Sequence, residues 1–216
     1  MKEIAKKIHS TLFDGIEPEN YLAVLGCTGY HLGKYRKGDI VAFEAENIRH
    51  IGIILSGTVD MIKEDFQGDK YMLLRLGRDE VFGETFACGS DSASIVTFMV
   101  SEDAEILFMP FSRMMHSCSK ACAFHHRLIE NMLRIIADKN RELLQKVEVV
   151  SKRTIRERLL VYLSMQPCKS EYIEIPFGRT ELAEYLCVDR SALSRELVKL
   201  KAEGVIDYDR NCFRIL

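Results

Sequence analysis

The chain has 216 residues, of which 47% are hydrophobic and 29% are charged, with 30 lysines and arginines against 32 aspartates and glutamates. This composition excludes a disordered chain and suits one large folded domain or two modest ones. The near-neutral net charge does not by itself indicate a nucleic-acid-binding protein, although residues 151–216 carry a small basic excess of 12 basic against 10 acidic side chains.

Two features of the sequence bear on its compartment. No apolar run approaches the length of a membrane span, and the first residues lack the apolar core of a signal peptide. Seven cysteines without a CxxC pair argue against a disulfide framework and fit a reducing environment. We therefore expect a cytoplasmic protein with no membrane contact.

Residues 1–25 have a helical pattern that is interrupted at 15–18. From residue 30 to residue 109 the pattern changes to short β-like runs separated by glycine-containing turns. Such regular spacing predicts an antiparallel roll or barrel. The expected strands are 40–43, 50–55, 58–63, 71–76, 94–100 and 105–109.

Pro110 ends this region, 111–117 can form a short helix, and 119–150 reads as one long helix without glycine or proline. One stripe of that helix alternates spacings of four and three, as in a coiled coil, and a single asparagine in such a seam fixes register and strand number. We expect a parallel homodimer, because a second stripe, containing Leu128 and Met132, can pack on the roll; the alternative is that the first stripe packs there. The seam comprises Ile129, Leu133, Ile136, Asn140, Leu143, Val147 and Val150.

A further helix is expected at 153–166, and the basic residues Lys152, Arg153, Arg156 and Arg158 at its start are candidates for contact with phosphates. Residues 179–204 then read as two short helices separated by an abrupt turn. Thr180 is expected to cap the first helix, and Asp189 the second. Buried stripes are expected at Leu182 and Leu186 in the first helix and at Leu193, Leu197 and Leu200 in the second, which Gly204 ends.

The opposite side of the second helix carries Arg190, Ser191, Ser194, Arg195 and Lys199. Arginine can read a guanine edge or clamp a phosphate, and serine adds hydrogen bonds without blocking close approach. A solvated polar face is the ordinary alternative for a single amphipathic helix, but two helices at this spacing favour DNA. Two short β-runs around 209–211 predict a hairpin, so the region reads as a winged helix-turn-helix.

Three stretches give the chain a resemblance to the Crp/Fnr family of bacterial transcription regulators: YRKGDIVAFEAENIRHIGIILSGTVDMIKED with LGRDEVFGE, the long helix, and RTELAEYLCVDRSALSRELVKLKAEGVIDY. The resemblance implies an α+β fold: a cyclic-nucleotide-binding-like β-roll at 1–118, a dimerisation helix at 119–150 and a winged helix-turn-helix at 151–216. It also implies a homodimer on a pseudo-palindromic double-stranded DNA site, with RNA polymerase as a partner and a small-molecule effector. The DNA-contacting residues it points to are Thr180, Arg190, Ser191, Ala192, Ser194 and Arg195, to which the exposed pattern adds Lys199.

The chain departs from the family pattern at two positions of this motif. Many members have glycine in the turn where this chain has Cys187, so the backbone there must be satisfied differently. The best-known members have glutamate, which reads cytosine, at the position of Ser191. Their operator sequences therefore do not transfer to this protein.

The effector pocket that the resemblance implies contains Gly83, Glu84, Thr85, Ser94 and Ile95. Cyclic-nucleotide-binding members use an arginine for the phosphate, and here no arginine lies between Arg78 and Arg113. A buried phosphate without a cation is costly, which argues against a cyclic nucleotide and favours a structural role for Glu84. The effector stays unknown.

Metal cofactors are restricted by the cysteine positions. Only Cys27 lies in the first 87 residues, which argues against the family's iron–sulfur cluster. A denser group, His116, Cys118, Cys122, His125 and His126, leaves a haem, metal or redox sensor as an alternative, although free cysteines and surface histidines are common. No arrangement for catalysis is present, so we expect no enzyme; a regulatory subunit acting on a protein partner is the third reading.

Overall fold

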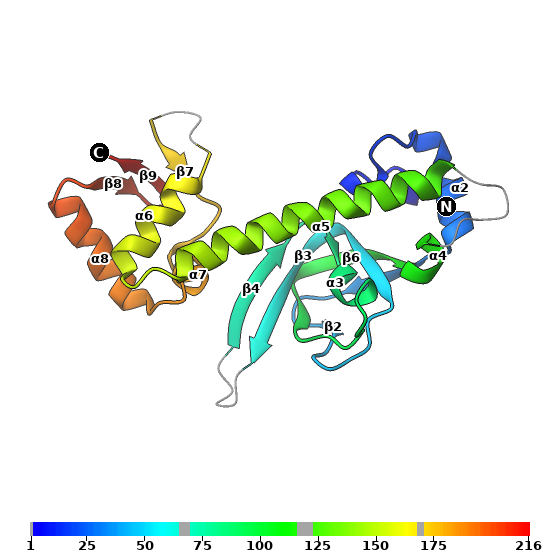
Figure 1. Cartoon of the computed structure of the whole chain (residues 1–216), viewed down its shortest axis with the longest axis horizontal. Helices are drawn as coiled ribbons and strands as arrows, with labels where there is room; N and C mark the ends of the chain where they lie inside the picture. Colours follow the sequence, from blue (N-terminus) through cyan, green and yellow to red (C-terminus); the bar gives the residue numbers. More distant parts are fainter. Residues whose placement is uncertain (1, 65–69, 116–122, 168–170) are drawn as a thin grey trace. The chain divides into compact units, whose positions relative to one another are not determined.

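The computed structural model describes residues 2–64, 70–115, 123–167 and 171–216. The chain forms two compact units, Met1–Lys139 and Asn140–Leu216, and the long helix α5, Ala123–Val150, runs through the boundary between them (Figure 1). None of the described helices is long and apolar enough to cross a membrane.

The start of the chain folds into short helical pieces: α1 Lys2–Ala5, η1 Thr11–Phe13, η2 Pro18–Asn20 and α2 Tyr21–Thr28. The predicted interruption is present, and Gly15 turns the chain there with a φ of 72°. Ile8, Leu12 and Leu25 are buried, and they join the core on which α5 packs.

An antiparallel sheet follows and forms the predicted roll. Its path is β1-β6-β3-β4, with β2 paired to β6 and β5 paired to β3. Figure 1 shows the small helix α3, Glu84–Ala87, next to the paired long strands β3 and β6. The strands are β1 His31–Tyr35, β2 Ile40–Ala42, β3 His50–Glu64, β4 Lys70–Leu76, β5 Val81–Phe82 and β6 Thr97–Pro110.

Two expected strand boundaries were wrong. Residues 50–55 and 58–63 belong to the single strand β3, in which Ser56–Gly57 is an irregularity rather than a corner. Gly57 has a φ of 82°, and a Cβ atom there would lie 2.2 Å from the carbonyl oxygen of Asp103 on β6. The expected strands at 94–100 and 105–109 likewise fall in the single strand β6, which begins only at Thr97, so residues 94–96 lie outside it. Strands β1 and β5 were not expected.

After α4, Phe111–Met115, helix α5 packs one face on the first unit. Leu128 and Met132 are buried there, as the second stripe predicted. The predicted seam lies elsewhere on the helix: Leu133, Leu143 and Val147 are 62%, 57% and 59% exposed. These apolar side chains are therefore exposed to solvent in a single copy of the chain.

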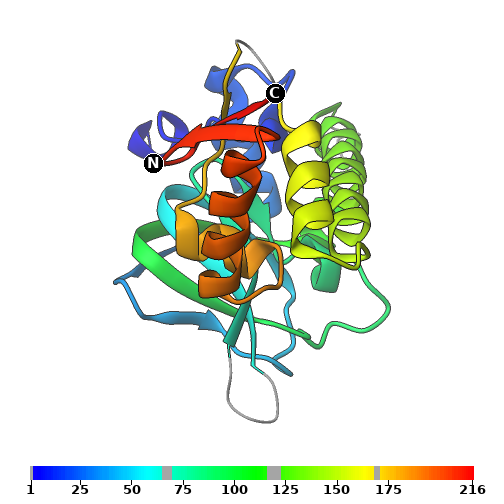
Figure 2. The same ribbon diagram turned by 90° about the vertical axis from the view of Figure 1, so that its left-hand side faces the viewer.

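The described part of the second unit contains the end of α5, three later helices and a small sheet (Figure 2). Its core gathers Val149 from the end of α5 with buried leucines from the later helices, and the sheet order is β7-β9-β8. Strand β7 was not expected; the hairpin β8–β9 was. The elements are α6 Ile155–Met165, β7 Ile173–Glu174, α7 Arg179–Tyr185, α8 Arg190–Ala202, β8 Ile206–Asp209 and β9 Cys212–Ile215.

Candidate nucleic-acid interface

The first helix of the predicted pair, α7, begins at Arg179, two residues earlier than a cap at Thr180 would place it. Its N-cap is Gly178, whose N–H donates to Oε2 of Glu181 at 2.9 Å. The expectation that Thr180 caps this helix was therefore wrong, because Thr180 already lies within the first turn and the Glu181 carboxylate satisfies the orphan donor. Thr180 is exposed at the start of the helix.

The turn between α7 and α8 is made at Cys187, which adopts a left-handed φ of 53°. Arg158 of α6 supports this conformation: its Nη1 donates to the carbonyl oxygens of Leu186 at 3.0 Å and Cys187 at 3.1 Å, while its Nε donates to Lys152 at 2.9 Å. A guanidinium group from another helix thus satisfies carbonyls that the turn leaves without helical partners.

The second helix, α8, is held at both ends as the sequence predicted. Oδ1 of the N-cap Asp189 accepts from the N–H of Ala192 at 2.8 Å. At the other end Gly204 has a φ of 71°, and the N–H of Val205 returns to the carbonyl of Leu200 at 3.0 Å. The buried stripe is Leu193, Leu197 and Leu200.

The opposite face of α8 is open to solvent within this unit. Arg190, Ser191, Arg195 and Lys199 are exposed there. Among the residues that the structure describes, the side chains of Arg190, Arg195 and Lys199 have no ion pair and no hydrogen bond. Ser194 is half-buried and its hydroxyl donates to the carbonyl of Arg190 at 2.9 Å.

The arginines of α6 differ sharply from those of α8. Nε of Arg156 lies 2.9 Å from Oε1 of Glu196, and its Nη2 lies 2.6 Å from Oε2 of Glu203. Both hydrogen bonds raise the pKa of Arg156. Arg156 is engaged by two carboxylates and Arg158 by backbone carbonyl oxygens of the unit, so neither guanidinium is free in this structure. That these two arginines contact phosphates stays a prediction.

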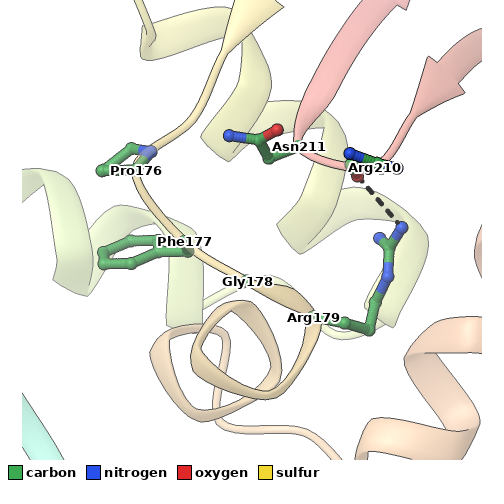
Figure 3. A pocket seen from close by; sticks show the side chains of 6 residues that line it. All are labelled: Pro176, Phe177, Gly178, Arg179, Arg210 and Asn211. Atoms are coloured by element: carbon green, nitrogen blue, oxygen red, sulfur yellow. Dashed lines mark hydrogen bonds between the residues drawn. The ribbon is translucent and has the colours of Figure 1, made fainter.

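A pocket of about 350 Å³ adjoins the start of α7 and the tip of the β8–β9 hairpin (Figure 3). Nη2 of Arg179 donates to the carbonyl of Arg210 at 3.3 Å, and its guanidinium lies 5.2 Å from the ring centre of Tyr208. Burial lowers the pKa of Arg179. These residues were not predicted from the sequence, although Arg179 directly precedes Thr180 and Arg210 lies in the expected hairpin turn. The lining residues are Pro176, Phe177, Gly178, Arg179, Arg210 and Asn211.

The predicted effector residues of the roll are held by internal contacts. Glu84 is 3% exposed, and its Oε1 lies 2.8 Å from Nζ of Lys139 on α5, which also donates to the carbonyl of Val81. Among the described residues Oε2 of Glu84 has no hydrogen-bond partner. Gly83 precedes it with a left-handed φ of 81°, and Thr85 is exposed.

Ser94 and Ile95, the second half of the predicted effector site, make local contacts or face solvent. The Ser94 hydroxyl donates to the carbonyl of Val96 at 2.6 Å, and the Ile95 side chain is 66% exposed. The nearby cation Lys63 donates to the carbonyl of Ile95 at 3.0 Å and pairs with Glu44. A pocket of about 400 Å³ on the roll involves none of the five predicted effector residues; it is lined by Lys34, Tyr35, Arg36, Ser56, Asp103, Ala104 and Glu105.

Three of the candidate metal ligands, His116, Cys118 and Cys122, lie outside the described residues. His126 pairs with Glu130 at 3.2 Å, and Nε2 of the buried His125 lies 3.9 Å from Sγ of Cys27. No group of three or more possible metal ligands occurs in the described part of the chain. The haem or metal alternative stays a prediction.

Two family models match the chain. Residues 32–120 match the Cyclic nucleotide-binding domain, and residues 157–216 match the Crp-like helix-turn-helix domain. Together they cover more than half of the sequence. A comparison with curated protein sequences found no match.

Solved structures with the same fold extend over nearly the whole chain. The c-di-GMP responsive global regulator CLP of Xanthomonas campestris has a TM-score of 0.68 at 17% identity, covering 92% of this chain and 99% of its own. A CooA mutant from Carboxydothermus hydrogenoformans has a TM-score of 0.63 at 18% identity, covering 90% of each chain. FixK2 of Bradyrhizobium japonicum has a TM-score of 0.60 at 16% identity, covering 86% of this chain and 92% of its own.

The order of the two matched domains, the α+β fold and the open recognition-type helix agree with one another. The chain belongs to the Crp/Fnr family of transcription regulators, with an effector-type β-roll domain followed by a Crp-like helix-turn-helix.

Proposed function

We propose that the protein is a homodimeric, sequence-specific DNA-binding regulator whose binding is controlled by an effector acting on the β-roll. The observation that carries this proposal is the open face of α8. Arg190, Arg195 and Lys199 are free there among the described residues, while Arg156 and Arg158 nearby are consumed by internal contacts. Cations left free on one helix face are the electrostatic footprint expected of a DNA reader.

The residues of this face differ in whether they can contact base edges or phosphates. Arg195 lies in the second turn of α8, where a guanidinium can donate two parallel hydrogen bonds to guanine O6 and N7 in the major groove. Ser191, one turn before it, is short enough for the helix backbone to approach the base edges. Arg190 and Lys199, at the two ends of the face, are placed to contact phosphates and fix the register of the helix.

The hairpin side of the unit offers a second contact with the phosphate backbone. Arg179, Arg210 and Asn211 line the pocket (Figure 3). Thr180, which follows Arg179 in the chain, is exposed. The guanidinium of Arg179 is oriented by the Arg210 carbonyl and the Tyr208 ring, so little side-chain entropy remains to be lost on binding a phosphate. These residues supply affinity rather than sequence preference.

The uncovered stripe of α5 supports the homodimer. Leu133, Leu143 and Val147 are each more than half exposed, and Asn140 occupies a single polar position between them. A second copy of the same helix would bury these side chains in a parallel coiled coil whose register Asn140 sets. The two helix-turn-helix units of the dimer would then contact two half-sites related by a two-fold axis, as on a pseudo-palindromic operator.

The contact between Lys139 and Glu84 supports effector control through α5. It joins a buried carboxylate of the roll to the helix that carries the seam, with side-chain exposures of 4% for Glu84 and 19% for Lys139. A ligand that changes the conformation of the roll around α3 would alter this ion pair. Through α5 it would then change the packing of the seam and the orientation of the helix-turn-helix. CLP, which has this fold, is c-di-GMP responsive, which supports a small-molecule effector as a class.

The proposal is tested by selecting duplexes from random DNA with the purified protein. We expect an enriched sequence made of two inverted half-sites whose centres are about one helical turn apart, bound by two copies of the chain. Leu143→Asp is the matched variant, because a charge in the seam should give a monomer by sedimentation and remove binding to the paired site. Enrichment of no sequence, with and without cell extract as a source of effector, would contradict the proposal and favour a protein partner.

A further inference from the structure

One residue on the open face of α8 does not fit a simple polar surface. Val198 is 63% exposed, whereas the three leucines of the same helix are buried. At 100° per residue it follows Arg195 by three positions and Ser191 by seven, so the three side chains lie along one line of the helix. Around the helix axis Val198 is thus in the middle of the proposed reading face, and along the axis it lies toward the carboxyl end of that face, next to Lys199.

Valine is a poor choice for a solvated helix surface. Its branched side chain lowers helix propensity, and its exposure leaves apolar area in water. The ends of the helix are independently held by Asp189 and Gly204, and the core is completed by leucines, so neither folding nor packing within this unit requires Val198. A contact made only in a complex explains it better.

The major groove offers one apolar group on a base edge, the C5-methyl of thymine. We propose that Val198 is a specificity-determining residue that packs against a thymine methyl next to the base pair contacted by Arg195. This inference rests on the proposed DNA-binding function and adds a second, apolar element to the reading of the operator.

The geometry restricts where that thymine lies. Three residues of α-helix rise about 4.5 Å, and successive base pairs are about 3.4 Å apart. The methyl group should therefore lie within one or two base pairs of the guanine read by Arg195. It should be on the side toward which the carboxyl end of α8 runs, away from the base pairs that Ser191 approaches.

The test uses the operator enriched by selection and replaces each thymine in turn by uracil, which removes only the methyl group. We expect one position in each half-site to lose about fourfold in affinity, the effect of exposing one methyl group, and about 15-fold when both half-sites are changed. In Val198→Ala these losses should disappear, while the variant binds the all-uracil and natural duplexes with closely similar affinity.

Lys199→Ala is the matched control, since it removes a neighbouring cation from the same helix. It should weaken binding to every duplex and leave the sensitivity to uracil unchanged. Alanine has higher helix propensity than either residue it replaces, so both variants should fold, as circular dichroism would show. In Arg195→Ala the lost guanine preference should map one or two base pairs from the methyl-sensitive position.

The outcomes separate this inference from the function it rests on. If the wild-type protein enriches an operator but no uracil substitution weakens binding, or if Val198→Ala keeps the same sensitivity, Val198 does not read a methyl group and its exposure belongs to a protein contact. If no operator is enriched at all, the proposed function itself fails.

Discussion

The turn of the helix-turn-helix depends on the guanidinium group of Arg158. Replacing Arg158 is expected to destabilise the second unit without altering the exposed face of α8. In Arg158→Met the three hydrogen bonds to the carbonyls of Lys152, Leu186 and Cys187, at 2.9, 3.0 and 3.1 Å, are lost. The methionine keeps most of the apolar stem, so the change isolates the polar contacts.

The expected cost follows from the exposure of each group. A hydrogen bond to a charged group contributes about 1.5–3 kcal/mol when it is well shielded. Arg158 is half-buried and Cys187 is exposed, so water can replace part of the loss. We expect a net destabilisation of about 2 kcal/mol in the free energy of unfolding of the second unit, which corresponds to about 10 °C in Tm for a unit of this size.

Hydrogen exchange measured by mass spectrometry resolves this unit from the first. About 2 kcal/mol corresponds to an approximately 30-fold loss of protection, and the amides of Cys187 and Val188, which close the turn, should show it. Arg153→Met is the control, since Arg153 is exposed just before α6. Equal protection in Arg158→Met and Arg153→Met would refute the assignment of the turn to Arg158.

Three further predictions follow from single contacts. Cys187→Gly should raise the stability of the second unit by about 1 kcal/mol in thermal unfolding, because glycine adopts the φ of 53° without steric cost; a lower Tm would contradict this. Burial, and then the charge of Glu84, raise the pKa of Cys88 to about 11, so its alkylation by iodoacetamide should still accelerate between pH 8 and pH 10, whereas a plateau below pH 9 would disprove the shift. Lys139→Met should destabilise the first unit by about 3–5 kcal/mol in urea unfolding by leaving a buried carboxylate unpaired, and adding Glu84→Gln should recover most of the loss.

The features that the sequence predicted well are those set by neighbours along the chain. The Asp189 cap, the leucine stripe of α8 and its end at Gly204 depend on residues within one or two turns, so spacing was sufficient. The two stripes of α5 were also separable by periodicity, and the structure buries Leu128 while leaving Leu143 exposed.

The features that it missed depend on residues far apart in the sequence. Gly57 reads as a turn, but the fold uses it where β3 passes so close to Asp103 that a side chain would not fit. Arg158 reads as a phosphate ligand until the fold brings it to Leu186, 28 positions later. Lys139 likewise shows no signal for its contact with Glu84, because only the packing of α5 on the roll brings the two together.

The claim that α8 reads DNA through Arg195 is tested most directly by fluorescence anisotropy on the selected operator and on all of its single base-pair variants. Wild-type protein should prefer one guanine in each half-site. Arg195→Ala should lose about 1–3 kcal/mol of binding free energy for each base pair it contacts and should no longer distinguish that guanine from other bases, while preferences at the other positions persist. Unchanged affinity and unchanged preference in Arg195→Ala would contradict the account.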